Sequence, residues 1–216
     1  SQKRLDTLPL MREKMKRVES LTMFCIASMA AQAQAHRCDN QPMQSLHFNT
    51  PESVNGWSAI DDRVMGGVSQ SRLTFHPEGH AVFEGEVSTQ NGGGFASVRH
   101  AQLRLGEQGS QGYRFHVRGD GKRYKLTLRT DQGLDGVNYQ AVLQPPAGRW
   151  VEATVPLNLF NPSYRGRPVP NAPALRPEHV CQVGWMVADG QVGPFRLDIR
   201  SITVLGPQVT RPWPAN

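Results

Sequence analysis

The stretch YRFHVRGDGKRYKLTLR, residues 113–129, predicts the fold class most directly. On both sides of its central Gly-Asp-Gly, apolar and polar residues alternate, which is the period-two pattern of a β-strand with one buried face. The pair Asp120-Gly121 is typical of a two-residue type I′ turn, so we expect a hairpin here. In that register Val117 would lie opposite Tyr124, and the apolar face of the hairpin would belong to a core.

The other face of this expected hairpin is basic. The same register would place Arg118 opposite Arg123, and like charges directly opposite each other destabilise a sheet. We therefore expect an offset from the acidic residues Glu84, Glu86 or Asp198, from solvent, or from an anionic ligand. The possible binding face consists of Arg114, His116, Arg118, Lys125 and Arg129.

Short runs of the same kind fill the chain after residue 40, punctuated by glycine and proline, of which the chain has 21 and 16. They predict strands at residues 46–48, 57–60, 71–75, 81–87, 95–99, 113–118, 123–130, 137–143, 150–155, 182–187 and 195–205. Residues 161–177 hold five prolines and predict a long irregular loop with polyproline character. Many short strands without helical periodicity predict an all-β, two-layer β-sandwich with jelly-roll topology.

The first 35 residues have the three parts of a secretory signal. A basic region at residues 12–17 precedes an apolar run at residues 21–31, and Ala33-Gln34-Ala35 matches an A-x-A cleavage site. The alternative is an N-terminal helix that stays on a soluble protein. We expect a signal peptide or N-terminal extension at residues 1–35, a jelly-roll domain at 36–205, and a flexible C-terminal tail at 206–216. The expected location is periplasmic or secreted, without a transmembrane segment in the mature chain.

Charge and cysteine content limit the partners and the cross-links that we expect for this chain. The net charge is +6, and residues 1–35 carry half of it, with six basic and three acidic residues. The remaining charge is small for a nucleic-acid binder, so we expect no nucleic-acid partner. Cys25 lies in the expected signal, which leaves Cys38 and Cys181 as a possible disulfide in an oxidising compartment. Two unpaired buried thiols are the alternative, because the sequence cannot show that their Cα atoms are close.

Motifs for catalysis or metal binding are scarce. No nucleophile elbow or phosphate loop is recognised. His76 and His80 are four residues apart, but a proline and a glycine between them exclude the helix that would place both on one face. Asp61, Asp62 and Asp120 are conceivable oxygen donors for calcium, although no calcium-loop pattern surrounds them. We expect no catalytic residue, no metal site and no cofactor.

A second stretch, DDRVMGGVSQS at residues 61–71, places two adjacent glycines between strand-like segments. Glycine there indicates a positive φ or a close backbone approach. Gly92–Ser97, Gly119–Tyr124, Trp150 with Val155-Pro156, and residues 195–204 follow in order. Together they resemble the signature of the complex I intermediate-associated protein family, the thirty-kilodalton assembly factor and its bacterial relatives. The resemblance covers roughly residues 48–204.

This resemblance implies a galactose-binding-like jelly roll and a non-enzymatic function. Eukaryotic members of the family help to assemble respiratory complex I as chaperone-like factors, so the implied partner is a protein, an assembly intermediate of a membrane complex. The motif positions, which we expect to be structural, are Asp62, Met65, Gly66, Gly67, Ser69, Gly94, Phe95, Gly119, Asp120 and Gly121.

A second hypothesis stays open, because an exported protein would lie across the membrane from a matrix or cytoplasmic assembly step. Galactose-binding-like domains commonly bind sugars, so the chain could be an exported carbohydrate-binding module, and its basic face would favour an acidic glycan. Such a module would expose one or two of Trp57, Trp150 and Trp185 on a sheet face. In the first hypothesis these tryptophans belong to the core.

Overall fold

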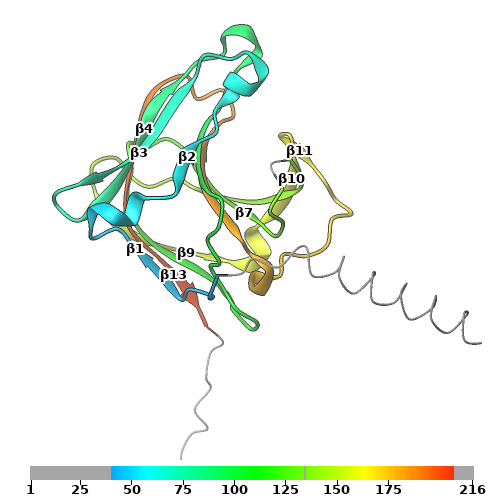
Figure 1. Ribbon diagram of the computed structural model, residues 1–216. Helices are drawn as coiled ribbons and strands as arrows, with labels where there is room; N and C mark the ends of the chain where they lie inside the picture. The colour runs from blue at the N-terminus through cyan, green and yellow to red at the C-terminus, as the bar shows by residue number, and fades with distance from the viewer. Residues whose placement is uncertain (1–39, 134, 207–216) are drawn as a thin grey trace, which may run out of the picture. The chain divides into compact units, whose positions relative to one another are not determined.

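In the computed structural model, which describes residues 40–133 and 135–206, two antiparallel β-sheets pack face to face (Figure 1). The first sheet has the order β3-β4-β13-β6-β9, and β1 pairs with β13 outside this path. The second sheet has the order β11-β10-β8-β7-β12-β5-β2. The strands are β1 (Ser45–His47), β2 (Trp57–Ala59), β3 (Gln70–His76), β4 (His80–Val87), β5 (Ala96–His100), β6 (Gly112–Arg118), β7 (Tyr124–Arg129), β8 (Asn138–Leu143), β9 (Trp150–Pro156), β10 (Asn161–Tyr164), β11 (Arg167–Pro168), β12 (Gln182–Val187) and β13 (Gly193–Leu205).

The expected all-β, two-layer sandwich is confirmed, and each expected strand is present with its ends shifted by two residues or fewer. Short 3₁₀ turns, such as η1 (Pro51–Val54) and η2 (Asp62–Met65), connect some of the strands. Among the residues that the structure describes, no helix is long and apolar enough to cross a membrane. Residues 1–35 and most of the expected C-terminal tail lie outside the described residues.

The expectation of an irregular loop over residues 161–177 is wrong in its first part. The short strands β10 and β11 form a hairpin there, in which Tyr164 pairs with Arg167 and Ser163 with Pro168. The turn residues Arg165 and Gly166 both have positive φ, 48° and 76°, as a type I′ turn requires. Pro168 is compatible with β11 because this strand is the edge of the sheet, where a missing N–H costs no ladder hydrogen bond.

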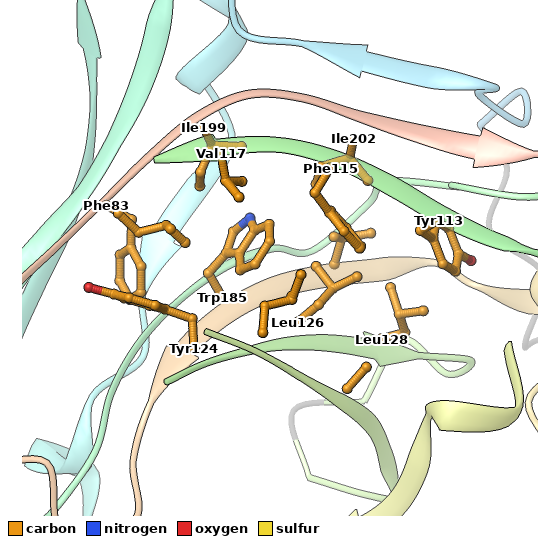
Figure 2. Close-up of a cluster of buried hydrophobic side chains, with 14 of the residues drawn as sticks. Phe83, Tyr113, Phe115, Val117, Tyr124, Leu126, Leu128, Trp185, Ile199 and Ile202 are labelled. Carbon is orange, nitrogen blue, oxygen red and sulfur yellow. The ribbon is translucent and has the colours of Figure 1, made fainter. Parts of the chain in front are cut away.

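The expected hairpin at residues 113–128 is also wrong, although its alternation is right. β6 pairs with β13 and β9, whereas β7 pairs with β12 and β8, so the two strands belong to different sheets. Their apolar side chains meet across the core instead of side by side (Figure 2). Alternation identifies the buried face of a strand, but it does not identify the strand that supplies its hydrogen bonds.

Asp120 explains why the chain crosses between the sheets at this point. Its carboxylate accepts hydrogen bonds from the Lys122 N–H at 3.0 Å, the Arg196 N–H at 2.9 Å and the Tyr124 hydroxyl at 2.9 Å. Gly121, with φ of 91°, turns the backbone, and Gly119 forms an isolated bridge to Ala147. The Gly-Asp-Gly segment is therefore a corner fixed to β13.

The core lies between the two sheets and is rich in aromatic side chains. Trp185 on β12 is fully buried, and its ring centroid lies 5.6 Å from that of Phe115 on β6 of the opposite sheet. Figure 2 shows Val117 and Ile199 facing this tryptophan from the first sheet, with Leu126 beside it on the second. Burying each such side chain stabilises the fold by about 1.5–3 kcal/mol, so this cluster dominates the packing of the two layers.

Candidate functional site

Asp62 is the centre of the DDRVMGGVSQS segment. It begins the turn η2, and its side chain is fully buried. Its carboxylate accepts hydrogen bonds from the Ser69 hydroxyl at 2.5 Å, the Ser69 N–H at 3.0 Å, the Gly94 N–H at 2.7 Å and the Phe95 N–H at 3.2 Å. One carboxylate therefore ties the segment around η2 to the loop that precedes β5.

The glycines of this region make room for that carboxylate. A Cβ at Gly67 would lie 2.3 Å from Asp62 Oδ1, and a Cβ at Gly93 would lie 2.5 Å from Asp62 Oδ2. Gly66 has a different role, because it ends η2 in the left-handed region with φ of 90°. The expectation of a positive φ or a close approach at the double glycine is confirmed, with one glycine serving each purpose.

Asp61 fastens the two sheets to each other at the same end of the molecule. Its carboxylate accepts hydrogen bonds from the hydroxyl and N–H of Ser71 on β3, at 2.6 and 3.0 Å, and from the N–H of Ser97 on β5 at 2.9 Å. β3 and β5 belong to different sheets. The oxygens of Asp61 and Asp62 are therefore engaged with N–H and O–H donors, which explains these acids without a calcium ion.

The electrostatics of Asp62 follow from these contacts. Burial raises the pKa of its carboxyl, but the hydrogen bonds from Ser69, Gly94 and Phe95 favour the charged form and together outweigh burial. The net result is a pKa below the usual range of aspartic acid. Asp62 is thus a buried anion at neutral pH, matched by donors and held as part of the scaffold.

The same segment exposes three aliphatic side chains, which we call the motif tip: Val64, Met65 and Val68. They are 77%, 60% and 42% exposed, respectively. Val68 also lines a shallow groove of about 460 Å³ over β3 and β4, together with polar residues such as Arg72 and Glu86. Of the motif residues identified from the sequence, Met65 is the large hydrophobic one that the structure leaves mostly exposed.

The remaining motif positions have structural explanations. Gly94 has φ of 145°, and the loop of Gly94 and Phe95 supplies donors to Asp62. Phe95 also accepts the backbone N–H of Asp62 through its carbonyl. Gly119, Asp120 and Gly121 form the corner described above. Each of these residues therefore has a contact or a backbone conformation that a structural role would need, apart from Met65, and the structural role of the motif stays a prediction.

The basic residues expected to share one face are divided between the two sheets. Arg114, His116 and Arg118 lie on β6, whereas Lys125 and Arg129 lie on β7 of the other sheet. The cause is the wrong hairpin register, since the expected pairs would exist only if β6 and β7 were neighbours.

Acidic partners lie beside several of these cations. Arg118 forms an ion pair with the buried Asp198 at 2.7 Å, and Lys125 pairs with Asp189 at 2.8 Å. Asp198 on β13 thus supplies the offset that the sequence predicted for Arg118, and no anionic ligand is needed to explain it.

The tryptophans expected in the core behave differently from one another. Trp185 is fully buried, whereas Trp57 and Trp150 are half-buried. The ring of Trp150 lies on the outer face of the first sheet, under the guanidinium groups of Arg118 at 4.9 Å and Arg200 at 4.2 Å. Both cations lie over the ring at cation–π distance, where a sugar ring would otherwise stack.

The structure answers part of the question of disulfide bonding. Cys181 is fully buried and disulfide-bonded. The other two cysteines of the chain, Cys25 and Cys38, lie outside the described residues. The pairing of Cys38 with Cys181 therefore stays a prediction.

A comparison with known protein families identifies the same part of the chain. The model of the family described as complex I intermediate-associated protein 30 (CIA30) matches residues 46–199. The chain belongs to this family. The residues that match the family model include Asp61, Asp62, the motif tip and most of the sandwich.

Curated relatives agree with this assignment. The chain is 29% identical over 174 residues to a protein of Drosophila melanogaster named complex I intermediate-associated protein 30, mitochondrial, and it covers 59% of that protein. It is 27% identical over 184 residues to an uncharacterized protein of Schizosaccharomyces pombe, covering 82% of it. A probable complex I intermediate-associated protein 30 of Caenorhabditis elegans is 25% identical over 185 residues. These matches span 70%, 73% and 76% of this chain, respectively. The chain spans 59% of the fly relative and 54% of the nematode relative.

Solved structures place the fold. A family 11 carbohydrate-binding module from Clostridium thermocellum, solved with a mixed-linked tetrasaccharide, matches with a TM-score of 0.54 and 15% identity over 77% of this chain and 98% of the module. A second structure of a family 11 module from the same organism gives the same TM-score and identity. The likeness confirms the jelly-roll fold, and at this identity it concerns the fold alone.

Proposed function

We propose that this chain is a non-enzymatic protein-binding domain that takes part, as a chaperone-like factor, in the assembly of a respiratory membrane complex. We further propose that the motif tip is where the assembly intermediate binds. The observation that carries the proposal is the exposure of Val64 and Met65, 77% and 60%, within a segment that buried carboxylates hold in place.

Rigid presentation of apolar side chains suits a binding surface. A flexible loop would lose conformational entropy on binding, whereas a loop already fixed by Asp61 and Asp62 loses less. Met65 adds a side chain that adapts its shape to the apolar surface of a partner. The neighbouring groove, with Val68 at its border, supplies polar groups at the rim of such an interface.

The carbohydrate-binding alternative has less support. Its fold resemblance says nothing of the ligand at 15% identity. Trp150, the tryptophan on an outer sheet face, is covered by Arg118 and Arg200, and Trp185 is fully buried. A glycan platform would therefore require these two arginines to move away from the ring.

Site-specific photocrosslinking in the native host would test the proposal. A photoreactive residue placed at Met65 should crosslink to a subunit of NADH:ubiquinone oxidoreductase or of its assembly intermediates. The matched control is the same photoreactive residue placed at Val142, which is 55% exposed on β8 of the second sheet. Crosslinks that are absent at position 65, or equal at both positions, would refute the assignment of the motif tip.

A variant series separates binding from folding. Replacing Val64, Met65 and Val68 with serine should weaken the captured complex by roughly tenfold or more, because exposed apolar anchors supply much of the binding energy. The melting temperature should stay close to that of the wild type, since these side chains are exposed. Unchanged capture by this triple variant would contradict the proposal.

A further inference from the structure

The hairpin that joins β3 to β4 brings two histidines together. His76 and His80 are directly opposite each other across the hairpin, and their rings stack with centroids 4.5 Å apart. Gly79 adopts φ of 79°, and its N–H donates to the His76 carbonyl at 2.9 Å. The proline and glycine that exclude a helix thus build a tight turn, which aligns the two side chains on one face of the sheet.

Glu78 completes a group of three metal-ligating side chains. One ligand atom from each of His76, Glu78 and His80 lies within 4.8 Å of the others. Glu78 is exposed, His76 is half-buried and His80 is buried. Within residues 40–133 and 135–206, this is the one group of three such side chains that meets this distance.

His80 gives the independent reason to consider a ligand. Its side chain is fully buried, and neither ring nitrogen has a hydrogen-bond partner in the described structure. Its Nε2 lies 3.8 Å from Asp198 Oδ1, which is beyond hydrogen-bond distance. Buried polar atoms without a partner are uncommon in proteins, because each loses its hydrogen bonds to water and gains none in return.

We propose that His76, Glu78 and His80 form a binding site for a divalent cation of the zinc class. Imidazole nitrogens with one carboxylate oxygen are a ligand set that Zn²⁺ commonly takes, with water at the fourth position. Asp198 would orient the His80 ring through its Nε2, since a metal-bound histidine usually directs the ring N–H that does not bind the metal to a carboxylate.

The ligand atoms must rearrange to bind. His76 has to turn out of its stack on His80, because the nitrogen lone pairs of two nearly parallel rings do not point to one position. Bonds of about 2.0–2.1 Å in a tetrahedral site place ligand atoms roughly 3.3 Å apart, so any separation that approaches the 4.8 Å limit must shorten. His80 is held by burial, with its ring centroid 5.3 Å from that of Trp150. Glu78 is free to turn in solvent, and the His76 Nδ1 accepts only a long hydrogen bond of 3.3 Å from the Glu78 N–H. A metal–nitrogen bond would replace that contact at small cost.

Zinc titration of the full chain by calorimetry, after removal of metals with a chelator and under oxidising conditions, would test the site. We expect saturable binding of Zn²⁺ by the wild type and a rise in melting temperature on loading. His76→Gln should weaken binding by at least roughly tenfold, and Glu78→Gln should weaken it to a smaller extent. His76 is half-buried and Glu78 exposed, so both variants should fold.

Two control variants test whether histidines outside this group contribute to zinc binding. His47→Gln replaces an exposed histidine of β1 whose Nε2 lies 3.1 Å from the Ser45 hydroxyl, and His36→Gln covers the segment before residue 40. Both should bind Zn²⁺ as the wild type does. The proposal is overturned if the wild type shows no saturable binding, or if His76→Gln and Glu78→Gln bind Zn²⁺ with unchanged affinity.

Discussion

Replacing Asp62 with asparagine is the sharpest test of the carboxylate that organises the motif segment. The change keeps the shape of the side chain but removes its charge and one acceptor. An asparagine that places its oxygen at the Oδ2 position keeps the donors Ser69 Oγ, Gly94 N–H and Phe95 N–H. The NH₂ group of the asparagine then faces the Ser69 N–H. In the wild type this N–H donates to Asp62 Oδ1 at 3.0 Å.

The expected cost follows from those contacts. Hydrogen bonds to a charged group contribute about 1.5–3 kcal/mol each and neutral ones about 0.5–1.5 kcal/mol, and a buried donor left without an acceptor costs about 1–3 kcal/mol. Some of these losses overlap, so we expect Asp62→Asn to lower the free energy of unfolding by roughly 2–4 kcal/mol. That corresponds to a decrease in melting temperature of about 5–15 °C for a domain of this size.

The cost should also depend on pH. Because the folded pKa of Asp62 is lowered, its contribution is fully present above the unfolded pKa, near 3.9. This contribution is lost as the pH falls through the lower folded pKa. The difference in stability between wild type and Asp62→Asn should therefore be constant between about pH 6 and pH 8 and shrink below about pH 4.

Urea unfolding of both proteins at several pH values, followed by tryptophan fluorescence, would measure this difference. Asp189→Asn is the matched control, because Asp189 is half-exposed and forms an ion pair with Lys125 at the surface. That variant should change stability by less than about 1 kcal/mol. A cost of Asp62→Asn below about 1 kcal/mol at pH 7, or one that does not shrink in acid, would refute the role given to this carboxylate.

Further predictions concern the same scaffold and the chain before it. Gly67→Ala should lower the free energy of unfolding by at least about 2 kcal/mol, because the added Cβ would lie 2.3 Å from the Asp62 carboxylate. In an Asp62→Ala background the same change should cost less, and additive costs in chemical unfolding would contradict this reasoning. Thiol counting on the denatured mature chain should find none free if Cys38 pairs with Cys181, a bond worth on the order of 4–5 kcal/mol for so long a loop; two free thiols would exclude the bond. Intact-mass measurement of protein from the native host should show a chain that begins at His36; a full-length cytoplasmic chain would exclude export.

The strands could be predicted from the sequence because the alternation of apolar and polar residues within each strand shows which of its faces is buried. Alternation in residues 113–118 and 124–128 identifies the side chains that reach the core, and the structure buries Tyr113, Phe115 and Val117 on that basis. The pairing of strands could not be predicted in the same way. Hydrogen bonds between strands involve the backbone N–H and C=O groups, which every residue type except proline carries alike. A Gly-Asp-Gly segment therefore fits a hairpin turn and a corner between sheets equally well.

The motif segment shows a similar division. The double glycine indicated a special backbone or a close approach, and the structure uses Gly66 for the first and Gly67 for the second. The identity of the approaching group, the Asp62 carboxylate, depends on the three-dimensional arrangement of the loop. Donors from Gly94 and Phe95, more than 30 residues away, complete that arrangement.

For this protein, the sequence by itself determined the fold class, the positions of the main strands and the membership of the CIA30 family. Those features depend on local periodicity and on residue types in a fixed order, which a chain carries whether or not it is folded. The tertiary structure alone decided that the basic residues divide between two sheets, that Met65 is exposed, and that His76 and His80 face each other. These are relations between residues brought together by the packing of two layers, and packing depends on the whole chain at once.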